Sequence, residues 1–287
     1  MFLPKKYKNL TESYVFYNLC LKNMEGVMAQ IIAFANQKGG VGKTTTAINI
    51  GASLAAIKKR VLLVDLDQQG NAGTGLGFER ASHTQSVYGV IMGTARVADN
   101  ILSTAVPGLH LLPSSQALAG ADVDLLDMEN REFRLRDALS AIDEYYDYIL
   151  LDCPPALGYL TINALTTADS VIIPLQCEFF ALEGVQQLTN TINIVREKWN
   201  PGLKILGVLL TMYDRRYGLT RAVDEDVRNT FGDTVFKTVV PRNVRVSEAP
   251  SHGKPALFYD FNSTGAQAYL RVATEVVQRT TGEKDGE

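Results

Sequence analysis

Apolar and polar positions alternate in two distinct ways along the chain. Short apolar runs rich in Val, Ile and Leu are separated by longer segments in which apolar residues recur at helical spacing. Several short runs have no polar position, which is typical of strands buried on both faces of a sheet. Strands are therefore predicted at residues 31–35, 61–65, 109–113, 148–152, 171–175, 205–210 and 235–240. Helices are predicted between them, including residues 44–58, 114–127, 130–143, 181–198, 219–230 and 264–278.

This order of elements decides the expected fold class. Strands that alternate with helices predict an α/β fold, a mostly parallel sheet with helices on both faces. In such a sheet, ligands bind beyond the carboxyl ends of the strands. The pattern contains no internal repeat and no long linker, so a single domain is expected over residues 29–280.

The two ends of the chain do not follow this pattern. Residues 1–28 carry four lysines, several aromatic residues and no clean period. They are interpreted as a disordered or partly helical extension, or as the product of an upstream start codon, with Met24 and Met28 as alternative starts. Residues 281–287 are expected to form a flexible tail.

Composition excludes several functional classes. The 31 acidic and 28 basic residues give a formal net charge of −3, so a role in nucleic-acid binding would need a local basic patch. The three cysteines are far apart and the three histidines are scattered, which argues against a disulfide framework or a zinc site and fits a reducing cytoplasm. No apolar run reaches about 18 residues, so no transmembrane helix is expected.

The stretch 36-NQKGGVGKT-44 lies between the first predicted strand and the first predicted helix. A glycine-rich loop that ends in Lys-Thr at this place is typical of a phosphate-binding loop. Its glycines allow backbone N–H groups to turn toward phosphates, and the helix adds its positive N-terminal end. Lys43 is expected at the β and γ phosphates, the Thr44 hydroxyl on Mg²⁺, and Thr45 at the α phosphate. A glycine-rich turn without a ligand is the disfavoured alternative.

The loop departs from the usual pattern at two positions. The pattern G-x-x-x-x-G-K-[ST] requires a glycine where this chain has Gln37. In addition, Lys38 places a second lysine in a loop that already contains Lys43. From the residues alone, Lys38 is most simply interpreted as a solvent-facing lysine.

Three aspartates follow predicted strands. Asp65 and Asp67 stand at the end of the strand 61–65, and Asp152 ends the strand 148–152. Because the phosphate loop also follows a strand, these carboxylates are expected at the same edge of the sheet. Mg²⁺ prefers oxygen ligands and keeps several waters, so Asp152 is assigned a water-mediated metal role beside Thr44. Each aspartate alone would equally suit a solvated strand end or a helix cap.

Five segments together resemble one family of ATPases. They are 38-KGGVGKTT-45, 65-DLDQQGN-71, 151-LDCPPALG-158, 210-LTMYDRR-216 and 239-VVPRNVRVSEAPSHGKP-255. The first three resemble the deviant Walker A family of P-loop NTPases, which includes ParA, Soj and MinD. The last two resemble its chromosomal ParA/Soj branch. The resemblance extends over residues 29–280 and implies a Mg²⁺-dependent ATP hydrolase with slow intrinsic turnover.

The resemblance also implies roles for individual residues. Lys38 corresponds to a lysine that crosses a dimer interface to the partner's ATP, as an arginine finger does in trans, so ATP would be sandwiched in a homodimer. Asp67 would position the attacking water, although Gln68 stands where the family usually has proline, which leaves the hydrolysis rate open. The implied ATP-binding residues are Lys38, Gly39, Gly40, Val41, Gly42, Lys43, Thr44, Thr45, Pro241 and Asn243, the last two against the adenine.

Basic side chains concentrate in residues 196–245, which hold ten Lys/Arg and six Asp/Glu, a net charge of +4. The family's non-specific DNA contacts map to Arg216 and Arg245, and three weaker candidates lie nearby, namely Arg215, Arg221 and Arg242. Contacts to phosphates carry no base code, so duplex DNA would be bound without sequence preference. From charge alone, the simpler interpretation is surface ion pairs with neighbouring aspartates, namely Asp214, Asp224 and Asp226.

These points lead to one functional hypothesis and two alternatives. The hypothesis is a cytoplasmic, nucleoid-associated ATPase that partitions a chromosome or plasmid with a ParB-like centromere-binding partner that stimulates hydrolysis. A MinD-like membrane ATPase would need a basic amphipathic C-terminal helix, but residues 266–280 hold only Arg271 and Arg279, so no membrane partner is expected. An electron carrier of the nitrogenase-reductase type would need two cysteines at an iron–sulfur cluster, and Cys153 and Cys177 lack the matching surroundings.

Overall fold

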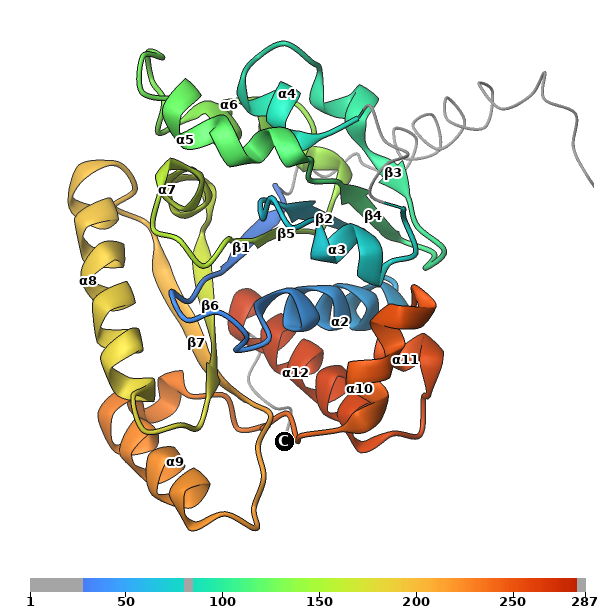
Figure 1. Ribbon diagram of the computed structural model, residues 1–287, viewed down its shortest axis with the longest axis vertical. Coiled ribbons are helices and arrows are strands. Elements are labelled where there is room, and N and C mark those ends of the chain that lie inside the picture. Colours follow the sequence, from blue (N-terminus) through green and yellow to red (C-terminus); the bar gives the residue numbers. More distant parts are fainter. Residues whose placement is uncertain (1–27, 80–84, 283–287) are drawn as a thin grey trace, which may run out of the picture.

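The computed structural model describes residues 28–79 and 85–282 (Figure 1). Its centre is a seven-stranded sheet with the order β3-β4-β2-β5-β1-β6-β7. The strands are β1 (Gln30–Phe34), β2 (Val61–Asp65), β3 (Leu102–Ser103), β4 (Leu109–Leu112), β5 (Tyr148–Asp152), β6 (Ser170–Gln176) and β7 (Lys204–Thr211). All neighbouring strands are parallel except β3 and β4. The predicted mostly parallel sheet is therefore confirmed.

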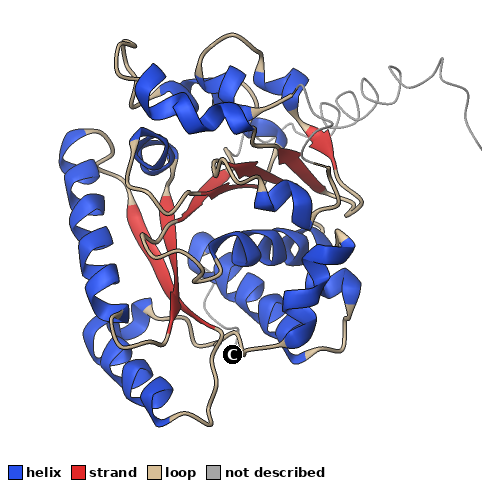
Figure 2. Cartoon of the chain, in the orientation of Figure 1, coloured by secondary structure: helices blue, strands red, loops and turns tan. Residues whose placement is uncertain are grey.

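Helices cover both faces of the sheet, as the blue and red elements of Figure 2 show. One face carries α2 (Lys43–Ala56), α3 (Asn71–Gly75), α10 (Val244–Glu248), α11 (Ala256–Tyr259) and α12 (Thr264–Thr281). The other carries α4 (Val87–Ile91), α5 (Ala121–Asp124), α6 (Arg134–Leu139), α7 (Tyr159–Thr167), α8 (Ala181–Lys198) and α9 (Gly218–Phe231). In β5, Ile149 and Leu151 belong to the second core while Tyr148 and Leu150 belong to the first. Burial on both faces thus explains the continuously apolar runs.

The predicted strand at 235–240 is wrong. The segment runs beside β7, where the Phe236 N–H donates to the Val208 carbonyl over 3.0 Å. The next two N–H groups, of Lys237 and Thr238, instead donate to the Glu275 carboxylate on α12, over 2.9 and 2.8 Å. A side chain therefore takes the donors that a strand ladder would use, and only isolated bridges remain.

Two predicted helices are much shorter than expected. Residues 114–127 contain a 3₁₀ turn, Gln116–Gly120, followed by α5, and residues 130–143 contain α6. Asn130 has a left-handed φ of 51°, which is incompatible with a helix that starts there. The sequence patterns also missed β3 and five helices of nine residues or fewer, namely α3, α4, α7, α10 and α11.

The described elements run from Gln30 at the start of β1 to Thr281 at the end of α12. Helix α12 continues to Thr281, one residue into the predicted tail. The predicted extension lies outside the described residues except for Met28, and so does the tail beyond Gly282. Within the described ranges, none of the helices combines the length and the apolar character that a membrane span demands.

Candidate functional site

The phosphate loop follows β1 and opens directly into α2. Gly40 and Gly42 have φ values of 77° and 87°, a left-handed backbone in which any other residue would be strained. The Gly42 carbonyl accepts the first helical hydrogen bond, from the Thr46 N–H over 2.8 Å. The Thr211 hydroxyl at the end of β7 donates to the Val41 carbonyl over 2.8 Å. The loop is thus held from both sides.

Lys43 lies inside this loop. Only 7% of the residue is exposed, and its Nζ donates to the Lys38 carbonyl over 3.3 Å. Burial lowers the pKa of Lys43, and the Asp152 carboxylate is the strongest of the neighbours that raise it. The ammonium is therefore fixed where the loop surrounds it, as the predicted contact with phosphates requires.

Lys38 points out of the same loop. Its ammonium pairs with the Glu178 carboxylate in the turn between β6 and α8, and 42% of its side chain is exposed. Its backbone N–H is held by the Asn36 side chain over 3.0 Å, and Asn36 donates in turn to the Pro174 carbonyl over 2.8 Å. The two lysines therefore occupy opposite environments, one buried and one at the surface.

Asp65 and Asp152 are aligned partners at the ends of β2 and β5, and both are fully buried. Asp65 accepts from the N–H groups of Asp67 and Ala72, over 3.1 and 3.0 Å. Burial raises the pKa of Asp65 to about 7, and these two N–H groups oppose the shift. Asp65 thus orders the loop after β2 and the start of α3, a structural role that the sequence prediction did not assign.

Asp152 differs from Asp65 because neither of its buried oxygens has a well-formed hydrogen bond within the described residues. Burial and the Asp65 carboxylate raise the pKa of Asp152, whereas the neighbouring Thr44 hydroxyl and Lys43 ammonium lower it. A buried carboxylate beside the Thr44 hydroxyl and the Lys43 ammonium fits a hydrated Mg²⁺. No cluster of three or more His, Cys, Asp or Glu that could hold a metal occurs in the described ranges, so phosphates and water would have to complete the coordination.

Asp67 lies in the turn after β2 and is partly exposed. One carboxylate oxygen accepts from the Gln69 N–H over 2.9 Å, and the Asp67 carbonyl accepts from the Ser114 hydroxyl over 2.5 Å. Hydrogen bonds of Asp67 and Gln69 therefore hold this turn on both sides of Gln68. Ser114 could not be predicted as its support, since it lies 47 residues away with no local signal.

Pro241 and Asn243 lie beyond the end of β7. Pro241 forms an isolated bridge with Tyr213, whose carbonyl accepts from the Arg242 N–H over 3.0 Å. The Asn243 side chain caps α10 by accepting from the Val246 N–H over 3.3 Å, and its amide donates to the Thr264 hydroxyl over 2.9 Å. Their contact with adenine stays a prediction.

The two predicted DNA-contacting arginines already have acidic partners. Arg216 pairs with Asp214 over 2.6 Å, and Arg245 pairs with Glu248 over 3.0 Å and with Asp260 over 3.4 Å. The ion pair expected from charge alone is therefore present for Arg216 and Asp214. It lowers the pKa of Asp214 to about 2 through the Arg216 hydrogen bonds.

Comparisons with known proteins agree with the phosphate loop and the fold. The AAA domain family matches residues 29–205. The chromosome partitioning protein ParA of Caulobacter vibrioides is 56% identical over 252 residues, which cover 87% of this chain and 94% of that protein. The sporulation initiation inhibitor protein Soj of Bacillus subtilis is 56% identical over 249 residues, which cover 87% of this chain and 98% of that protein.

A solved structure extends the agreement to three dimensions. The crystal structure of cobyrinic acid a,c-diamide synthase from Mycobacterium smegmatis with bound ATP analog and magnesium has a TM-score of 0.79 and 40% identity to this chain. The match covers 89% of this chain and 98% of that chain. From the phosphate loop, the aspartates that end β2 and β5 and these relatives together, we conclude that this chain belongs to the ParA/Soj family of P-loop ATPases.

Proposed function

We propose that this chain uses ATP and Mg²⁺ to dimerise, binds duplex DNA without sequence preference and partitions a chromosome or plasmid. A ParB-like centromere-binding protein would stimulate hydrolysis and thereby release the DNA. The observation that carries this proposal is the pair of diverging lysines, Lys43 buried inside the phosphate loop and Lys38 exposed at its rim. Lys43 serves the chain's own phosphates, which leaves Lys38 for the nucleotide of a second copy.

The phosphate loop and its neighbours bind the nucleotide. Lys43 and the loop N–H groups would hold the phosphates, and Thr44 and Asp152 are the residues that would hold Mg²⁺. Mg²⁺ supplies positive charge at the phosphates and at the leaving group. We assign Pro241 and Asn243 to the adenine, and the Asn243 amide has a second N–H beyond the one that binds Thr264.

Asp67 and Lys38 carry the hydrolytic step. The Gln69 N–H fixes one Asp67 oxygen, and the other has no partner within the described residues and is free to orient water. Lys38 of the partner subunit's chain supplies positive charge where phosphoryl transfer develops negative charge. In a single chain, Lys38 is instead paired with Glu178, so intrinsic turnover is expected to be slow.

The relatives support the role in partition. One similar chain is named chromosome partitioning protein ParA, and that name favours a role in chromosome partition. We extend this role to a cytoplasmic, nucleoid-associated ATPase with a ParB-like partner. DNA contacts come from exposed arginines beyond β7, Arg216 and Arg245 among them. If a dimer presents about four such arginines, the logarithm of the binding constant falls against log salt with a slope of about −3.6.

The decisive experiment is a retention assay on immobilised duplex DNA of random sequence, with and without ATP and Mg²⁺, beside a flotation assay on anionic liposomes. We expect DNA retention that depends on ATP and no binding to the liposomes. Liposome binding without DNA retention would replace the proposal with a MinD-like membrane function. Retention that is equal with and without ATP would contradict the nucleotide-dependent dimer.

A further inference from the structure

A three-residue segment at the end of β7, residues 211–213, contacts the phosphate loop at one end. The Thr211 hydroxyl donates to the Val41 carbonyl over 2.8 Å, and the two residues are almost completely buried, at 2% and 1% exposure. The Met212 methyl group lies next to Gly42, since a side-chain carbon added to that glycine would be 3.7 Å from it. Residues 211–213 therefore contact two consecutive residues of the loop, one through a hydrogen bond and one through packing.

The same three residues hold the chain around Pro241 at their other end. The Tyr213 N–H donates to the Val240 carbonyl over 2.9 Å, and the Tyr213 carbonyl accepts from the Arg242 N–H over 3.0 Å. These two hydrogen bonds flank Pro241, which forms a bridge with Tyr213. The phosphate loop and the segment assigned to the adenine are thus attached to the same three residues, although they are far apart in the sequence.

The Tyr213 side chain anchors residues 211–213 on α9. Its hydroxyl donates to one oxygen of Asp224 over 2.8 Å, and the other Asp224 oxygen accepts from Arg228 over 2.7 Å. Arg228 also donates to the Phe236 carbonyl over 3.3 Å. Because a connected network of hydrogen bonds makes the groups that it joins rigid, Tyr213 has a fixed place relative to α9.

Met212, between these two anchors, has a backbone conformation that is unfavourable for its residue type. Its φ is 48°, in the left-handed region that residues other than glycine seldom adopt. A strained residue persists only where the surrounding contacts fix it, and such residues cluster at ligand sites. Here the contacts of Thr211 and Tyr213 fix Met212 from both sides, so residues 211–213 have one defined geometry.

We propose that residues 211–213 set the spacing between the phosphate loop and the adenine-contacting segment, with Thr211 and Tyr213 as positioning residues for ATP. The inference rests on the proposed function, in which Pro241 is assigned to the adenine. A nucleotide reaches its full affinity only when its phosphates and its base are bound together, and a fixed spacing lowers the entropy lost when the second end binds. The connection therefore raises the affinity for ATP more than the affinity for the triphosphate alone.

The test compares ATP with inorganic tripolyphosphate, a chain of three phosphates without adenosine. Isothermal titration calorimetry with Mg²⁺ measures the affinity for each ligand, and the ratio of the two affinities is the readout. Thr211→Val keeps the shape of the side chain and removes the donor to Val41. It should lower the affinity for ATP on the order of tenfold, with a smaller loss for tripolyphosphate, so the ratio should fall. Thr211→Ser, which keeps the hydroxyl, should restore the ratio. Tyr213→Phe, which removes the bond to Asp224, should lower the ratio by less than Thr211→Val.

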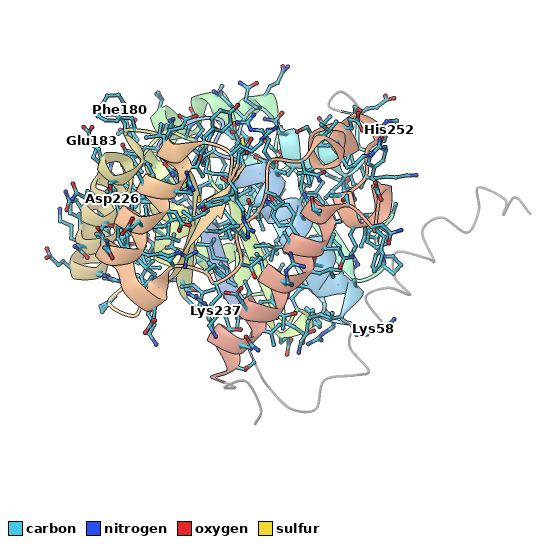
Figure 3. The ribbon with its side chains drawn as sticks, turned by 90° about the horizontal axis from the view of Figure 1, so that it is seen from below. Lys58, Phe180, Glu183, Asp226, Lys237 and His252 are labelled. Atoms are coloured by element: carbon cyan, nitrogen blue, oxygen red, sulfur yellow. The ribbon has the colours of Figure 1, made fainter. Side chains whose placement is uncertain are left out.

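Two matched controls separate positioning of ATP from general stability. Thr167, at the C-terminal end of α7, is also a buried threonine whose hydroxyl donates to a backbone carbonyl, that of Asn163 over 2.6 Å. Thr167→Val should therefore leave the ratio unchanged. Met212→Gly relieves the left-handed strain but loosens the connection, so it should lower the ratio. Lys58→Gly relieves the same kind of strain, at a φ of 68°, and should keep the parent's ratio, since Figure 3 shows Lys58 on the opposite side of the molecule from Asp226 of α9.

A parent that prefers ATP, together with a Thr211→Val variant that keeps the parent's ratio, would overturn the inference and leave the proposed function standing. Equal losses for the two ligands would also overturn it, because Thr211 would then act on the phosphate loop alone. An unchanged ratio in Met212→Gly would do the same, and its comparison with Lys58→Gly stands even if Thr211→Val does not fold. A parent that binds tripolyphosphate as tightly as ATP would contradict both the inference and the assignment of Pro241 to the adenine.

Discussion

The phosphate loop and the exposed arginines beyond β7 both carry positive charge, but the chain holds these side chains in opposite ways. Lys43 is 7% exposed, donates to a loop carbonyl and lies beside the buried Asp152. Arg215, Arg242 and Arg271 are exposed and have no acidic partner in the described ranges. Burial and a hydrogen bond fix the Lys43 side chain in the phosphate loop, whereas the exposed arginines can change their side-chain conformation.

This difference determines how each region responds to change. In the buried region the low dielectric strengthens each interaction. Removal of one side chain therefore leaves its neighbours without a hydrogen-bond partner or an opposite charge. At the surface, each contact contributes little, contributions add, and salt screens them. Substitutions should therefore have large, specific effects in the phosphate loop region and small, salt-dependent effects at the exposed cations.

Asp67→Ala is expected to have the largest effect. Loss of the water-orienting carboxylate should lower ATP turnover by on the order of 10²- to 10⁴-fold while ATP binding persists, so the variant accumulates as an ATP-bound dimer. Phosphate release and size-exclusion chromatography with ATP measure the two properties. Asp67→Ala turnover close to that of the parent would remove the catalytic assignment and leave a purely structural turn.

Lys43→Ala should have the next largest effect. Truncation of a buried, hydrogen-bonded charge costs about 2–5 kcal/mol, which corresponds to a loss of ATP affinity of roughly 30-fold to several thousandfold. Isothermal titration calorimetry measures this loss. The matched control is Lys38→Ala, which should keep ATP affinity in the monomer and lose ATP-dependent dimerisation. If Lys43→Ala and Lys38→Ala lost ATP affinity equally, the buried and the exposed lysine would not have the different roles assigned to them.

Asp152→Asn should stabilise the folded chain by an amount that depends on pH. The raised pKa of Asp152 means that the folded chain binds a proton that the unfolded chain has released above about pH 4. The parent therefore loses stability as pH rises toward the folded pKa, and the variant escapes this loss. In the absence of nucleotide, the variant's thermal midpoint should exceed the parent's by a few degrees at pH 8 and by less at pH 5.

The same substitution at Asp65 provides the control for this prediction. Asp65 accepts from two backbone N–H groups, so Asp65→Asn removes an acceptor and should lower the thermal midpoint. In addition, Mg²⁺ with ATP should stabilise Asp152→Asn less than it stabilises the parent. A lower midpoint for Asp152→Asn at pH 8 would mean that its buried carboxylate is satisfied in the folded chain.

The sequence predicted the phosphate loop well because its chemistry is contiguous. Strand, glycines, Lys43, Thr44 and helix follow each other within one short stretch, and the left-handed φ of Gly40 and Gly42 explains why glycine stands there. The alignment of Asp65 with Asp152 also followed from the sheet, since both end neighbouring parallel strands.

The remaining features depend on contacts between distant residues, which periodicity does not report. The segment 235–240 has the apolar composition of a strand, but Glu275 on α12 takes its N–H groups. Likewise, the sequence places Arg271 only on a candidate membrane-binding helix, and the fold alone brings it to one surface cavity with Arg215 and Arg242. The Glu178 partner of Lys38 lies 140 residues away and has no local signal.

Glu178→Gln should have the smallest effect and tests the boundary between the two regions. The pair of Lys38 and Glu178 is exposed on both sides, at 42% and 45%, so it contributes at most about 1 kcal/mol. It nevertheless competes with the proposed contact of Lys38 across the dimer. The variant should therefore reach half-maximal dimerisation at a lower ATP concentration, by less than about fivefold, and the difference should shrink at high salt. Glu183→Gln, an equal loss of charge on an exposed residue of α8, should leave the ATP requirement unchanged. A higher ATP requirement in Glu178→Gln would mean that Glu178 supports the dimer instead of restraining Lys38.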